Sequence, residues 1–230
     1  MASKELVRTW QLIPTNGDPC INPNADSNGF YGMLQRTEID SSVRQLLPSA
    51  CDRFEEALFF VQLLMSLEVC EANQDAANWC LGAHLVAFIG INDAAEHDFD
   101  VIGRNYKESS IKKEFGLKSS DADPFLRDPV AIYKIYRDLR NIRTHFGERL
   151  LEVSTVMQLA DVGTDAGLPR WYLRQLKTLN FEQLRTPISE FEIHKIAEFY
   201  KRPLVAILCQ SLYVMARAIN ESAAALSSPN

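Results

Sequence analysis

The sequence predicts a mainly α-helical protein, a helical bundle preceded by a turn-rich N-terminal extension. Apolar residues recur at spacings of three and four over several long stretches, the pattern of helices with one buried face. Glycine, proline, asparagine and aspartate crowd residues 16–29 (NGDPCINPNADSNG), where successive turns leave no room for a regular element. With 230 residues and 47% hydrophobic content, the chain can bury a sizeable core. We therefore expect an extension over residues 1–50 and a helical domain over 51–230, with an insert near 151–183.

Two amphipathic stretches open the domain, after one short helix within residues 30–47. We expect the first long helix at about residues 51–72. Glu68 falls within its apolar face, so this carboxylate must find a partner, reach water at the helix end or take up a proton. The second helix is expected at about residues 75–102, and its apolar middle places it at the centre of the bundle. The apolar positions of the first helix are Phe54, Leu58, Val61, Leu64, Met65 and Val69.

A third long helix follows a connection over residues 103–127, which holds a short helix around residues 111–116 (IKKEFG). The pair Asp128 and Pro129 favours a helix start, because aspartate caps free backbone donors and proline loses no hydrogen bond there. Gly147 can end this helix. Its apolar stripe comprises Ile132, Ile135, Tyr136, Leu139, Ile142 and Phe146.

The C-terminal third begins with a mixed pattern between residues 151 and 181, where a turn-rich segment separates two short runs and allows a small β-hairpin. Ser189 and Glu192 fit a capping box at a helix start. The apolar pattern over residues 191–218 predicts one long helix interrupted near Pro203, or two consecutive helices.

Composition excludes several classes of protein. A net charge of -6 argues against a broad nucleic-acid or anionic-membrane footprint, although a small basic site fits. The chain has neither an apolar run of about 18 residues nor a signal-peptide pattern, so we expect a cytoplasmic protein without a membrane partner. The odd number of cysteines and the lack of CxxC spacing indicate reduced core thiols. They are Cys20, Cys51, Cys70, Cys80 and Cys209.

The third long helix carries a polar cluster in RDLRNIRTHF, residues 137–146. A helical wheel places Arg137, Arg140, Asn141 and His145 off its core face, as a polar ridge. A guanidinium binds phosphate oxygens in a fork, and an imidazole takes and returns a proton near neutral pH. RNA supplies its own nucleophile, the ribose 2′-hydroxyl, so the ridge suits metal-independent cleavage of RNA.

The spacing of Arg140, Asn141 and His145 in an all-helical chain resembles the Rx4-6H motif of the HEPN superfamily. The resemblance covers roughly residues 50–150 and implies an up-and-down bundle that forms a homodimer through the motif helix. It also implies a metal-independent endoribonuclease of toxin–antitoxin or defence systems, without a cofactor, acting on RNA and controlled by an antitoxin or regulatory protein. In that hypothesis His145 is the general base or acid, Arg140 stabilises charge on the phosphate, and Asn141 positions a phosphate oxygen.

Several alternatives stand beside this hypothesis. The ridge could be a solvated cationic face, a non-catalytic RNA-binding or protein-interaction surface, or part of a helical scaffold whose motif is accidental. A metal centre is disfavoured because no histidine follows a glutamate by three residues and HExxH is absent. His84 is expected to be a satisfied buried histidine and Glu96 with His97 a solvated helix end, whereas Glu68 or Glu71 could supply an accessory acid.

Overall fold

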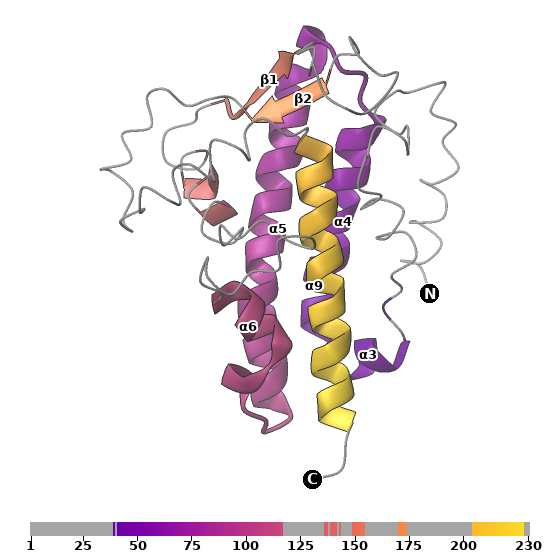
Figure 1. Cartoon of the computed structure of the whole chain (residues 1–230), viewed down its shortest axis with the longest axis vertical. Coiled ribbons are helices and arrows are strands. Elements are labelled where there is room, and N and C mark those ends of the chain that lie inside the picture. Colours follow the sequence, from indigo (N-terminus) through magenta and orange to yellow (C-terminus); the bar gives the residue numbers. More distant parts are fainter. Residues whose placement is uncertain are drawn as a thin grey trace, which may run out of the picture.

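The protein is mainly α, as the sequence predicts. The computed structural model describes residue 39 and residues 41–116, 136–137, 139–141, 143, 149–154, 170–173 and 204–227. Within these ranges the long helices α4, α5 and α9 run along the long axis of the molecule, with α6 near one end and strands β1 and β2 near the other (Figure 1). The predicted turn-rich segment, the start at residues 128–129, Gly147 and the capping box lie outside the described residues.

Helices α4 (Pro48–Ser66) and α5 (Gln74–Val101) form the centre of the core. The predicted bounds of α5 are confirmed within one residue at each end. The predicted end of α4 at residue 72 is wrong, because the backbone becomes extended at Leu67 (φ -80°, ψ 132°). Glu68 consequently lies exposed in the connection and reaches water. A short 3-10 helix, η2 (Glu71–Asn73), leads into α5.

Helix α9 (Leu204–Ser227) begins directly after Pro203 and packs against α4 and α6. Its buried stripe repeats at helical spacing, as the sequence predicts, but the helix extends nine residues beyond the predicted end at Ala218. Ser222 explains part of this extension, because its buried hydroxyl accepts a hydrogen bond from the Ile111 amide of α6 (3.2 Å). The stripe consists of Leu208, Leu212, Met215 and Ile219.

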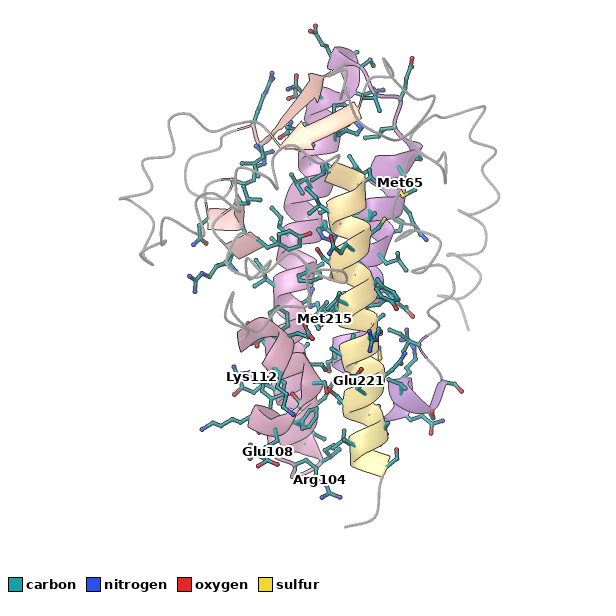
Figure 2. The ribbon with its side chains drawn as sticks, viewed as in Figure 1. Met65, Arg104, Glu108, Lys112, Met215 and Glu221 are labelled. Carbon is teal, nitrogen blue, oxygen red and sulfur yellow. The ribbon has the colours of Figure 1, made fainter. Side chains whose placement is uncertain are left out.

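Helix α6 (Ser110–Gly116) confirms the short helix expected around residues 111–116. Gly103 (φ 67°) reverses the chain after α5, and the short 3-10 helix η3 (Tyr106–Glu108) leads into α6. The Lys112 ammonium lies 5.3 Å from the centre of the Tyr106 ring. Figure 2 shows Arg104, Glu108 and Lys112 gathered at this end of the molecule.

Two short elements flank the long helices. Helix α3 (Ser41–Leu46) packs on α4 and α9 through buried Val43. Strands β1 (Leu151–Ser154) and β2 (Arg170–Leu173) pair antiparallel with Val153 opposite Trp171, so the hairpin allowed by the sequence forms there. In the part of the chain described above, no helix has the length and apolar run needed to cross a membrane.

Candidate functional site

The polar ridge is described in part. Positions 136, 137, 139, 140, 141 and 143 are helical, in agreement with the predicted third long helix, and we call them the motif segment. Arg140 and Asn141 lie next to each other and are half-buried. Arg140 donates from Nε (3.3 Å) and Nη2 (3.0 Å) to Oδ1 of Asn141. His145 lies outside the described residues, so its distance from this pair stays untested.

Tyr136 anchors the motif segment in the core. Its ring, 1% exposed, meets the rings of Phe88 (5.0 Å between centroids) and His84 (5.7 Å) edge-on. Its hydroxyl forms a hydrogen bond of 2.7 Å with Ser211 Oγ on α9. Leu139 is also buried, so the predicted apolar stripe is confirmed at its two described positions. The core side of the segment is therefore fixed against both α5 and α9.

Arg143 lies across α5 at Gly82. A β-carbon added to Gly82 would stand 3.6 Å from Cγ and 3.7 Å from Nε of Arg143. Arg137, Arg140 and Arg143 are all half-buried. The ridge is therefore packed in part against the protein, which differs from a fully solvated cationic face. The arginine stem therefore packs on α5 at a distance that leaves room for a β-carbon at position 82.

The chain that follows the motif is held by the first turns of α5. Buried Asn78 accepts hydrogen bonds through Oδ1 from the backbone amides of Leu150 (2.7 Å) and Leu151 (3.1 Å). Gln74 donates to the carbonyl of Leu151 (2.5 Å), and Arg149 pairs with Asp75 at 3.0 Å. These four contacts hold residues 149–151 against the start of α5. These contacts could not be predicted from the sequence, because an asparagine within an apolar helix has no pattern that shows which backbone amides it will bind.

His84 lies beneath the motif segment and is fully buried. Its Nδ1 donates to the Ala57 carbonyl at 3.0 Å, which sets the tautomer, because a carbonyl only accepts. Burial lowers the pKa of His84 to about 4, so the ring is neutral at physiological pH. Nε2 has no hydrogen-bond partner among the residues that the structure describes. The expected buried histidine is therefore satisfied at one nitrogen only.

The described acidic and histidine side chains at the two ends of α5 do not converge on one site. Glu68 and Glu71 are exposed before the start of α5, whereas Glu96 and His97 are exposed near its end. At about 1.5 Å per residue, the two pairs are separated by roughly 35 Å along the helix. Among the described residues no group of three or more histidine, cysteine, aspartate or glutamate side chains could hold a metal ion.

The cysteines offer no activated nucleophile within the described ranges. Cys51, Cys80 and Cys209 are buried free thiols and Cys70 is a half-buried one, whereas Cys20 lies outside the described residues. Burial raises the pKa of Cys51 to about 12 and also raises that of Cys80. Both groups therefore stay protonated at neutral pH and behave as small apolar side chains.

Comparison of the chain with protein-family models, curated proteins and solved structures gives no match. The class that the fold defines is a mainly α protein built on long packed helices. Its most distinctive described polar feature is the half-buried pair Arg140 and Asn141 on a segment anchored by Tyr136.

Proposed function

We propose that the protein is a HEPN-like, metal-independent endoribonuclease that acts as a homodimer. Arg140 and His145 carry the chemistry, and Asn141 positions the phosphate. The observation that carries this proposal is the contact between Arg140 and Asn141 on a segment whose core side is fixed by Tyr136. Two neighbouring polar side chains held on an anchored helix are the kind of pre-organised donor set that stabilises a developing anion.

The hydrogen bonds of the pair define what it can offer an anion. Asn141 uses Oδ1 to accept from Arg140, so its amide nitrogen is the group left to donate outward. A guanidinium has five N–H donors, and this contact uses two of them. The remaining donors suit phosphate oxygens, which arginine binds in a fork. Partial burial of both side chains strengthens such contacts, because less water competes for them.

The proposed reaction needs no metal. His145 removes the proton of the ribose 2′-hydroxyl, whose oxygen attacks the neighbouring phosphorus, and the bond from phosphorus to the 5′-oxygen breaks. The leaving 5′-oxygen takes a proton, and the products are a 2′,3′-cyclic phosphate and a 5′-hydroxyl end. Arg140 stabilises the extra negative charge on the phosphate oxygens during this step. The protein is a candidate toxin or defence ribonuclease, with an antitoxin or regulatory protein as partner.

Cleavage of labelled total RNA by the purified chain in excess EDTA tests this function. We expect wild type to cut, His145→Ala to lose activity, and Arg140→Lys to lose most of it because lysine keeps the charge but not the fork. Arg217→Ala is the matched control, since it removes one exposed positive charge from α9. Cleavage that persists in His145→Ala, or requires Mg²⁺, contradicts the proposal.

A second candidate function is a non-catalytic module that binds RNA or a partner protein through the same ridge. The net charge of -6 and the packing of Arg143 against α5 favour a protein partner over RNA within this alternative, because both reduce the basic surface that is free to bind phosphates. In this case His145→Ala weakens binding without any turnover to lose. Filter binding and cleavage assays on the same variants separate the two functions.

A further inference from the structure

A buried hydrogen bond joins the motif segment to α9. The hydroxyl oxygens of Tyr136 and Ser211 lie 2.7 Å apart, and both residues are buried. The Ser211 hydroxyl donates its single proton to the Ile207 carbonyl at 2.8 Å, because a carbonyl can only accept. Tyr136 is therefore the donor to Ser211. The proton positions along this chain of two hydrogen bonds are fixed, and so is the direction in which the tyrosine hydroxyl points.

We propose that Ser211 is a positioning residue for the pair Arg140 and Asn141. It acts through Tyr136, which lies four residues before Arg140 on the same helical segment. Four residues make slightly more than one turn, so the two side chains leave the helix only about 40° apart. A rotation of the segment that moves Tyr136 consequently moves Arg140 by the same angle. The catalytic meaning of this placement rests on the proposed function.

The apolar contacts of Tyr136 define this rotation less closely than the hydrogen bond does. Its ring meets the rings of Phe88 and His84, and burial of apolar surface has no preferred direction. A hydrogen bond, in contrast, weakens steeply as its angle and length change. A rotation of about 10° moves an atom about 6 Å from the helix axis by roughly 1 Å. A misplacement of that size can slow a reaction about a hundredfold.

The pair of hydroxyl groups supplies orientation that apolar side chains at the same places would not. Phenylalanine at position 136 and alanine at position 211 keep the apolar contacts. Replacing both partners of a buried hydrogen bond in this way is often nearly neutral for stability. The Ile207 carbonyl still accepts the backbone amide one turn later in α9, so it is not left unpaired. A fully satisfied polar pair in a core selects one arrangement of the helices that carry it.

The side chain of Arg140 reports its own placement in the absence of RNA. Its Nε donates to Oδ1 of Asn141, so the signal of this N–H group in a nitrogen–proton correlation NMR spectrum depends on the contact. Arg140→Lys removes the signal and thereby assigns it. We expect Ser211→Ala, and the double variant with Tyr136→Phe, to shift or broaden the signal.

Ser222→Ala is the matched control for this experiment. Ser222 lies on the same helix, is equally buried, and accepts a hydrogen bond from the Ile111 amide of α6, away from the motif segment. Its loss should leave the Arg140 signal unchanged. The double variant leaves neither hydroxyl unpaired, so it decides the matter even if Ser211→Ala alone does not fold. An unchanged Arg140 signal in the double variant, or an equal change in Ser222→Ala, overturns the proposal.

Cleavage of labelled RNA by the same variants measures the consequence for the reaction. We expect kcat to fall at least tenfold in the double variant while KM stays within about twofold of wild type, because RNA still binds but Arg140 is displaced from the developing charge. A kcat equal to that of wild type overturns the positioning role. Because the NMR signal is measured without RNA, a wild type that fails to cleave contradicts only the proposed function.

Discussion

The carboxylate of Asp98, near the end of α5, accepts a hydrogen bond of 2.9 Å from the backbone amide of Ala50, in the first turn of α4. Its second oxygen accepts from the Ser49 amide at 3.2 Å. Leu47, which precedes α4, supplies no side-chain cap. Asp98 therefore caps a helix from 48 residues away, and its negative charge lies at the positive end of the α4 dipole.

Removal of this cap should lower the free energy of unfolding. We expect Asp98→Ala to cost about 1–3 kcal/mol, because the buried amide of Ala50 and the partly buried amide of Ser49 lose their acceptor. Urea unfolding followed by circular dichroism measures the change. Asp100→Ala, on an exposed residue of the same helix, serves as the control and should stay within about 0.5 kcal/mol of wild type. Equal stability of the two variants would mean that Asp98 does not support α4.

The bounds of α5 could be predicted because buried positions recur at helical spacing from Ala77 to Phe99. The end of α4 could not, because Val69 is buried in the connection and continues the apolar spacing after the helix has stopped. A helical wheel shows which positions would face the core, but it cannot show whether the backbone is still helical. The capping role of Asp98 was not predicted for a related reason. Asp98 lies within an acidic run that is typical of a solvated helix end, although its position falls on the buried face.

The candidate site was predictable only at the level of helix geometry. Adjacent residues such as Arg140 and Asn141 are neighbours in any conformation, and the apolar stripe with Tyr136 and Leu139 placed the segment on the core. No sequence pattern indicated that Asn78 would hold the backbone that follows the motif segment. Such a contact between a side chain and a distant backbone amide has no periodicity, so it becomes visible only when the fold is known.

Asn78 should control how firmly the end of the motif is held. Asn78→Ala removes the acceptor of two buried amides, so we expect a loss of about 2–4 kcal/mol and faster amide exchange at Leu150 and Leu151. Hydrogen exchange followed by mass spectrometry reports on these peptides. The control is Asn105→Ala, which removes an exposed asparagine from the turn before η3. Unchanged exchange at residues 150–151 would contradict the role of Asn78.

His84 should make the protein less stable in mild acid. The unfolded chain takes up a proton near pH 6.5, whereas the folded chain does so only near pH 4, because burial lowers the pKa. The contribution of neutral His84 to the free energy of unfolding is complete above pH 6.5. It is lost as the pH falls toward 4, by up to about 1.4 kcal/mol per pH unit. Unfolding titrations at pH 7.5 and pH 5 measure this loss. His84→Phe should reduce the difference in stability between the two pH values, because phenylalanine takes up no proton.

Two glycines should respond to alanine in opposite directions. Gly82 is helical, and a β-carbon there meets Arg143 only at ordinary contact distances of 3.6 and 3.7 Å. Gly82→Ala should therefore stabilise the protein by about 0.5–1 kcal/mol, because alanine restricts the unfolded chain and favours the helix. Gly103 has open space around it but a φ of +67°, which costs an alanine about 1–2 kcal/mol. Thermal unfolding of both variants measures whether their stabilities change in opposite directions. Destabilisation by Gly82→Ala would mean that Arg143 cannot tolerate the added methyl group.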